Sequence, residues 1–173
     1  MINFEQELQA FSEEIESFMR EKREQGRTLF NKSIKNLIID SSIQAMVWVQ
    51  YTPFFNDGDT CEFGVGEPFI IFDGFDPNDI KSVYEYEDLS SGDNPSALWS
   101  FHAASSYHQE RLKPLYEKYN VSKETLAHFN SLAKFMQTNS DIMQQLFGDH
   151  VQVAVYMSDN NTVEVVVSEY DHE

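Results

Sequence analysis

Residues 43–51, with the sequence IQAMVWVQY, decide the fold class because their side chains divide between two faces at every second position. In an extended backbone, Ile, Ala, Val, Val and Tyr lie on one side, and Gln, Met, Trp and Gln lie on the other. This period of two is typical of a β-strand, whereas a helical face repeats every three or four residues. The sequence therefore predicts a strand over residues 43–51.

Two more strands are predicted directly after this one. The sequence NDGD at residues 56–59 is a strong turn signal, because Asn, Asp and Gly adopt the backbone angles of tight turns most easily. Apolar residues then alternate over 61–66, and the apolar run FIIF at 69–72 indicates a buried strand. Residues 43–72 are therefore expected to form a hairpin unit with a third strand.

A second hairpin is predicted near the C-terminus, where valines alternate over 151–157 and 163–167 around a turn at 159–161. Between the two hairpin units, residues 103–148 carry helical periodicity. We therefore expect one domain over residues 1–173 with an α+β fold: a mostly antiparallel sheet of about five strands in two hairpin units, with helices on one face.

The N-terminus is predicted to form an amphipathic helix over residues 3–24. Gly26 is expected to end it, and a second helix is expected from Thr28 to about Asp40. Large apolar residues recur in the first helix at spacings of four and three; this apolar stripe comprises Phe4, Leu8, Phe11, Ile15 and Phe18. One expectation is that the stripe packs on the protein's own core. The alternative is a protruding helix, residues 1–25, that forms a homodimer through residues 3–24.

Acidic residues are concentrated in the middle of the chain. The formal net charge is −17, and residues 53–95 hold eleven acids against one base, Lys81, a net of −10. A field of this sign repels nucleic acid and anionic membranes and attracts basic protein surfaces. With aromatic residues at 14%, the chain differs from a disordered acidic tail, so the acids are expected on a folded protein.

Residues 73–98 are expected to form a long acidic loop with one short helix near 79–86. Acids alternate with Tyr over 83–89, which suits a contact surface, because Tyr supplies area and carboxylates steer toward Arg and Lys. The plainer alternative is a solvated loop that keeps the protein soluble. Our candidate partner-binding residues, from the first hairpin and this loop, are Phe54, Phe55, Asp57, Asp59, Glu62, Asp73, Asp76, Asp79, Tyr84, Glu85, Tyr86, Glu87 and Asp88.

Signals for catalysis or metal binding are weak. Residues 56–62 resemble part of a calcium loop, with Asp57, Asp59 and Glu62 as ligands, but the spacing of a full twelve-residue loop is missing. His102 and His108 do not have zinc-protease spacing, and on a helix they would be poorly placed to share a ligand. The single cysteine, Cys61, fits a buried strand position better than a nucleophile. No catalytic residue, metal or cofactor is therefore predicted.

Residues 48–63, WVQYTPFFNDGDTCEF, resemble a segment of uncharacterised bacteriophage and bacterial proteins. Those proteins typically read Tyr-Thr-Pro-Tyr-Phe-Asn-Asp-Gly-Asp-Pro-Cys-Glu-Phe, and this chain departs from them at Phe54 and Thr60. The resemblance covers about a tenth of the chain and implies a phage or bacterial intracellular protein. It carries over no catalytic residue.

Together these observations predict a non-enzymatic, phage-encoded acidic protein of the host cytoplasm. It is expected to bind and inhibit or modulate a host protein with a basic surface, as a nucleic-acid mimic, without binding nucleic acid or membrane itself. The N-terminus lacks the basic and apolar regions of a secretory signal, which favours the cytoplasm. Two alternatives stay open: a metal-dependent enzyme with a carboxylate site, and an assembly protein that dimerises through its N-terminal helix.

Overall fold

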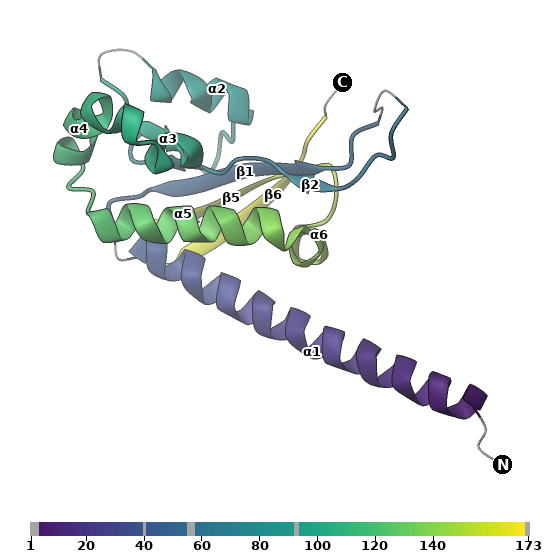
Figure 1. Ribbon diagram of the computed structural model, residues 1–173. Helices are drawn as coiled ribbons and strands as arrows, with labels where there is room; N and C mark the ends of the chain where they lie inside the picture. Colours follow the sequence, from purple (N-terminus) through teal and green to yellow (C-terminus); the bar gives the residue numbers. More distant parts are fainter. Residues whose placement is uncertain (1–3, 40, 55–57, 92–93, 172–173) are drawn as a thin grey trace.

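An antiparallel sheet organises the protein, for which the computed structural model describes residues 4–39, 41–54, 58–91 and 94–171 (Figure 1). Its strands lie in the order β4-β3-β1-β5-β6, and β2 pairs with the end of β1. The α+β class and the mostly antiparallel sheet are confirmed. The strands are β1 (Ala45–Tyr51), β2 (Gly64–Val65), β3 (Phe69–Ile71), β4 (Ala97–Trp99), β5 (Val151–Met157) and β6 (Val163–Glu169).

The central strand β1 is buried on both faces, which is the reason its two sets of side chains are almost entirely apolar. Met46 lies opposite Ile70 of β3 on one side and opposite Val155 of β5 on the other. These three side chains belong to the cluster under the main helices, whereas Ala45 and Val47 point to the opposite face. The alternation of side chains over residues 43–51 thus indicated a β-strand correctly, and the strand itself spans Ala45–Tyr51.

Helices cover one face of the sheet and supply most of the core. Phe30, Phe129 and Met143, from α1, α5 and α6, belong to the same hydrophobic cluster as Trp48 of β1. The side chain of Ser122 accepts a hydrogen bond from the Thr125 backbone N–H at 3.0 Å and so begins α5. The helices here are α1 (Phe4–Ile39), α3 (Ser100–Ala104), α4 (Gln109–Lys118), α5 (Lys123–Thr138) and α6 (Ser140–Phe147), with a 3₁₀ turn, η2 (Ser106–His108), before α4.

Residues 73–90, here called the acidic cover, pack on the second face of the sheet instead of forming a free loop. They contain α2 (Val83–Glu87) and η1 (Asp88–Ser90). Tyr86 is buried with Ala45, Val47 and Tyr156. Gln152 of β5 fixes the segment, because its side chain accepts a hydrogen bond from Val83 N–H at 2.9 Å and donates one to the Lys81 carbonyl at 2.6 Å.

The N-terminal region is one helix, so the expectation that Gly26 ends a first helix is wrong. Gly26 lies inside α1, which runs unbroken for 36 residues. A Cβ atom at this position would lie 2.6 Å from Cδ1 of Ile142 in α6. The glycine therefore serves the close approach of two helices, and this packing outweighs its cost of about 1 kcal/mol in a helix interior.

The N-terminal half of α1 projects away from the rest of the molecule, and its end lies far from the sheet (Figure 1). Every described residue from Phe4 to Lys22 is exposed. The expectation that the apolar stripe packs on the protein's own core is therefore wrong. No described helix, including α1, combines the length and apolar character needed to span a bilayer.

Candidate interaction surfaces

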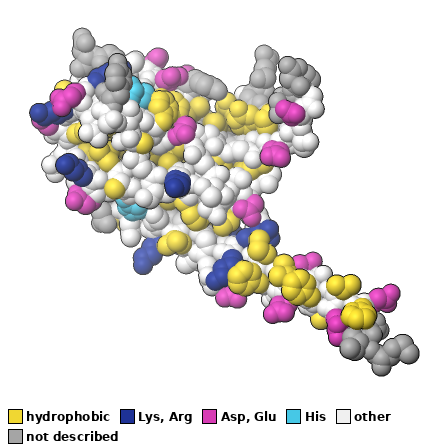
Figure 2. All heavy atoms as spheres, viewed as in Figure 1, with side chains coloured by type: hydrophobic (Ala, Val, Ile, Leu, Met, Phe, Trp, Pro, Cys, Tyr) yellow, Lys and Arg dark blue, Asp and Glu magenta, His cyan; other side chains and the backbone are white. Residues whose placement is uncertain are grey.

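The apolar stripe on the projecting half of α1 is the most unusual surface of the protein. Phe4 is 69% exposed and Phe11 is 63% exposed, and Leu8, Ile15 and Phe18 are also exposed. Figure 2 shows these hydrophobic side chains along the projecting helix, with acidic side chains beside them. Single exposed apolar residues are ordinary, but a continuous row on one helix face marks an interaction site.

The spacing of the stripe is that of a coiled-coil helix, in which positions a and d of each heptad abcdefg are apolar. With Phe4 at d, the stripe takes alternate d and a positions, Lys22 and Gln25 take the next a and d, and Leu29 takes the following a. The residues of α1 that enter the core lie at other positions. Phe30, Ile34, Leu37 and Ile38 fall at b, f, b and c.

The body of the protein, meaning everything packed around the sheet, therefore contacts a different face of α1 from the one that bears the stripe. Leu29 continues the stripe beside the body and is 61% exposed. The face that carries the a and d positions is thus open from the N-terminus of α1 to the point where the helix meets the body.

Contacts with α6 and α5 anchor α1 where it leaves the body. Gly26 lies against Ile142, and the Arg23 guanidinium donates to the Asp141 carboxylate at 3.1 Å. Phe30 inserts among aromatic rings, with ring centroids 6.2 Å from Trp48 and 6.1 Å from Phe135. The projecting half is therefore the continuation of a firmly packed helix and not a separate tail.

An apolar groove of about 210 Å³ lies beside this anchor, between α1 and α5. It begins next to the exposed Leu29 and runs along α5. Its lining residues are Leu29, Phe30, Ser33, Ser131, Leu132 and Phe135. At Leu29 the exposed apolar surface of α1 therefore continues into this groove.

The acidic cover displays most of its candidate residues to solvent. Among the described residues, no ion pair joins these acids to a basic side chain. Glu85 is exposed, but it already accepts a hydrogen bond from Ser82 N–H at 2.7 Å as part of a helix cap. The exposed acids of this segment are Asp73, Asp76, Asp79, Glu85, Glu87 and Asp88.

Tyr86 is buried and cannot contact a partner, so its prediction as a partner-binding residue is wrong. The side chain is only 1% exposed, and its hydroxyl accepts a hydrogen bond from Lys81 N–H at 3.0 Å. Burial raises the pKa of Tyr86 despite that hydrogen bond, so the ring is a neutral part of the core. Tyr84 lies in α2, and its side chain is outside the described part of the structure.

The first hairpin presents only part of its expected surface. Phe54 is 70% exposed and stacks on His150 with ring centroids 4.8 Å apart. Asp59 and Glu62 are exposed, and Phe55 and Asp57 lie outside the described residues.

Metal-binding groups do not converge in the described residues, where no cluster of three or more His, Cys, Asp or Glu side chains could hold an ion. His102 and His108 are not on one helix, the case that the sequence analysis considered: α3 ends between them and η2 turns the chain, and their ring centroids are 4.5 Å apart. Burial lowers the pKa of His102, and His108 and Arg111 lower it further. The neutral form of His102 is therefore favoured.

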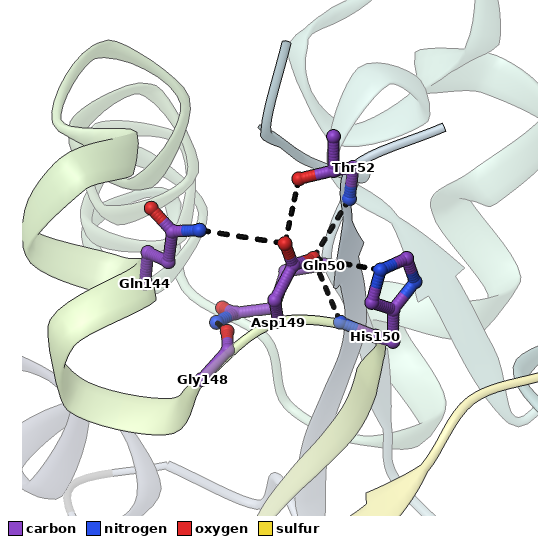
Figure 3. A network of polar contacts seen from close by, with 6 residues as sticks. All are labelled: Gln50, Thr52, Gln144, Gly148, Asp149 and His150. Carbon is purple, nitrogen blue, oxygen red and sulfur yellow. Dashed lines mark hydrogen bonds and ion pairs between the residues drawn. The ribbon is translucent and has the colours of Figure 1, made fainter. Parts of the chain in front are cut away.

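Asp149 organises a polar network that the sequence analysis missed (Figure 3). Its carboxylate accepts hydrogen bonds from the Thr52 backbone N–H at 2.7 Å and from the Thr52 hydroxyl at 2.6 Å. It also accepts one from His150 N–H at 2.8 Å. Burial raises the pKa of Asp149, but these hydrogen bonds outweigh burial, and the net pKa lies below its ordinary value.

Gln50 completes this junction from within the core. It accepts a hydrogen bond from the Trp48 indole N–H at 3.1 Å and donates to the Met143 carbonyl at 3.1 Å and the Gly148 carbonyl at 2.6 Å. The network thus ties the end of β1 to the turn between α6 and β5. A lone Asp or Gln in a sequence gives no signal for such a role, because its partners are about a hundred residues away.

Comparison with protein-family models, with curated proteins and with solved structures gives no match for this chain.

Proposed function

We propose that this protein is a non-enzymatic assembly protein in which the apolar stripe of α1 pairs with the stripe of a second copy. The observation that carries the proposal is the exposure of a heptad-spaced apolar row on a helix anchored in the body. A row of this kind is costly in water unless another apolar surface covers it. A second copy of the chain is always present with the first, and it carries an apolar stripe with the same heptad spacing.

The area available is large enough for a specific dimer. The stripe, together with Met19 and Leu29, gives seven side chains that each expose between 43% and 69% of their surface. At roughly 100 Å² for each large side chain, pairing removes on the order of 1,000 Å² or more from water over both copies. This value reaches the lower limit for a stable protein–protein interface.

Light scattering with two matched triple variants tests the proposal. Leu8→Glu with Phe11→Glu and Ile15→Glu places three charges on the stripe. Gln6→Glu with Gln9→Glu and Ala10→Glu adds the same charge to the opposite face of the same helix, at positions f, b and c. Samples are measured up to roughly 100 µM, where an interface of this size is expected to be populated.

The wild type and the opposite-face variant are expected to have twice the chain mass of 20.1 kDa, and the stripe variant is expected to have the single-chain mass. Circular dichroism and the fluorescence of Trp48 and Trp99 check that each variant keeps its fold. A wild-type mass of 20.1 kDa throughout the concentration range would contradict the proposal.

The acidic cover supports a second candidate function, which is binding to a basic surface of a host protein as a nucleic-acid mimic. The supporting observation is the row of exposed carboxylates at Asp73, Asp76 and Asp79, which have no ion pair among the described residues. Unpaired carboxylates can attract Lys and Arg at long range, and salt weakens that attraction.

A lysine-rich peptide is a suitable probe for this second function. Asp73→Asn with Asp76→Asn and Asp79→Asn is expected to weaken peptide binding, and DNA is expected to have no affinity for either protein. Glu5→Gln with Glu7→Gln and Glu13→Gln is the matched control, because it removes three charges from α1. Equal weakening by both sets would attribute binding to net charge alone and would reject the acidic cover as the site.

A further inference from the structure

We propose that the two copies of α1 pair in parallel, with both bodies at the same end of the paired helices. This inference rests on the proposed self-association and adds its orientation and register. It follows from three features of the chain: the charges that flank the stripe, the polar interruption at Lys22 and Gln25, and the exposed Leu29 beyond that interruption.

Parallel pairing avoids like-charge contacts at the edges of the interface. In a parallel two-stranded coil, each g position faces an e position of the partner in the next heptad. The three acidic g residues would therefore face uncharged residues. Glu7, Glu14 and Glu21 would lie opposite the partner's Ser12, the partner's Met19 and the partner's Gly26.

Antiparallel pairing brings those same acids together, because g positions then face g positions. One antiparallel register sets Leu8 against the partner's Phe18 and Phe11 against the partner's Ile15, but it leaves Phe4 opposite the partner's Lys22. That register also places Glu14 opposite the partner's Glu14. Like charges at such spacing are destabilising, and this arrangement additionally leaves Leu29 uncovered on both copies.

A shifted antiparallel register would cover Leu29 with the partner's Phe4, but it mismatches the polar positions. Lys22 would then lie against the partner's Phe11, and Gln25 would lie against the partner's Leu8. Burying an ammonium group or an amide against apolar side chains costs more than leaving it in water. Neither of these two antiparallel registers therefore satisfies both the charges and the apolar residues.

In the parallel register each a or d residue meets the same residue of the partner. The polar residues Lys22 and Gln25 therefore meet the partner's Lys22 and the partner's Gln25, and Leu29 meets the partner's Leu29. A single Lys at an a position is a known means of fixing register and oligomer state in coiled coils, at some cost in stability.

Most contacts between α1 and the body lie away from the a and d face, since Phe30, Ile34 and Leu37 take b and f positions. Gly26, at an e position beside that face, lies against Ile142 of α6, so the partner's Glu21 would lie next to α6 there.

Disulfide crosslinking tests the orientation in a Cys61→Ser background, which removes the single native thiol. Leu8→Cys places a thiol on the stripe, and in a parallel dimer it faces its own copy. In the antiparallel register that sets Leu8 against the partner's Phe18, the two thiols lie ten residues apart along the paired helices, about 15 Å, too far for a disulfide. Ala10→Cys, on the outer face of α1, is the control.

In a glutathione redox buffer, Leu8→Cys alone is expected to form at least about tenfold more covalent dimer than Ala10→Cys, because pairing raises the effective thiol concentration. A dimeric protein in which Leu8→Cys forms no more than the control would overturn the parallel orientation. So would a crosslink formed only when Leu8→Cys is mixed with Phe18→Cys. A monomeric mass by light scattering would instead reject the self-association itself, so the two failures are distinguishable.

Discussion

The two halves of α1 belong to one unbroken helix, yet they differ completely in what covers their apolar residues. In the C-terminal half, Phe30 and Leu37 are 1% and 2% exposed beneath α5, α6 and the sheet. In the N-terminal half, Phe4 and Phe11 are 69% and 63% exposed. A single helix thus serves both as part of the core and as an arm that carries an apolar surface into solvent. The comparison teaches that helical periodicity identifies a face without identifying what covers it.

The largest expected difference between the halves is in the stability of the body. Phe30→Ala removes a ring packed against Trp48, Phe135 and Phe147, and is expected to cost about 3–5 kcal/mol of unfolding free energy. Phe11→Ala makes the same chemical change on the arm and is expected to leave the body's stability unchanged. Urea unfolding followed by the fluorescence of Trp48 and Trp99, both in the body, measures both effects.

The protein is kept dilute in this experiment so that association does not contribute to the measured stability. Circular dichroism provides a second signal for the arm. A loss of body stability with Phe11→Ala comparable to that with Phe30→Ala would show that the two halves do not differ in the way described.

Asp149 gives a test of moderate size that concerns the body alone. Asp149→Ala leaves the Thr52 backbone N–H without its acceptor and is expected to cost about 1–3 kcal/mol. Because folding lowers the pKa of Asp149, its contribution is fully present above the ordinary value of 3.8 and is lost as the pH falls through the lower folded value. The variant should therefore lose stability less steeply with acid than the wild type does.

Asp141→Ala is the matched control for this pH experiment. It removes the same charge from the start of α6, where the carboxylate is more exposed and contacts Arg23. Unfolding midpoints measured from pH 2 to pH 7 separate the two carboxylates. If stability fell equally steeply with decreasing pH in the wild type and in Asp149→Ala, the Asp149 carboxylate would not contribute to stability in the way described.

The smallest effect is expected at Gly26, where the two halves of α1 meet. Gly26→Ala gains about 1 kcal/mol of helix propensity but loses about 1–3 kcal/mol through overpacking against Cδ1 of Ile142. The net change should be a small loss of stability. Ile142→Val removes the atom that the new methyl group would meet, so in that background Gly26→Ala should become neutral or stabilising.

A double-mutant cycle measures this coupling directly. Additive effects of the two substitutions would mean that the contact between α1 and α6 does not explain why this position is a glycine. The helical content at 222 nm shows whether α1 stays continuous in each variant.

Strands with strict alternation could be predicted from the sequence, and β1, β5 and β6 appear where the valine patterns indicated. The short strand β4 could not, because three residues after Pro95 are too few to establish a period. Gly26 misled the prediction of α1 for a different reason. Its preference for helix ends is worth only about 1 kcal/mol, and tertiary packing against α6 exceeds that.

The candidate surfaces were harder to predict than the fold. The acids of the acidic cover are exposed as expected, because carboxylates stay in water unless they are paired. Tyr86 could not be placed, since alternation of Tyr with Glu is equally compatible with an exposed ring and with a helix that buries one side. The network of Asp149 and Gln50 depends on residues about a hundred positions apart and leaves no local pattern.

Because α1 continues unbroken through Gly26, a small rotation of the helix at that point moves its N-terminal end over a much larger distance. From Gly26 to Phe4 the arm is about 33 Å long, at 1.5 Å per residue. A rotation of about 10° where α1 rests on α6 would therefore displace the tip by about 6 Å, roughly the distance between neighbouring turns of a helix. Small differences in how α1 rests on α6 at Gly26 and Ile142 are therefore magnified along the arm, at the rings of Phe4 and Phe11.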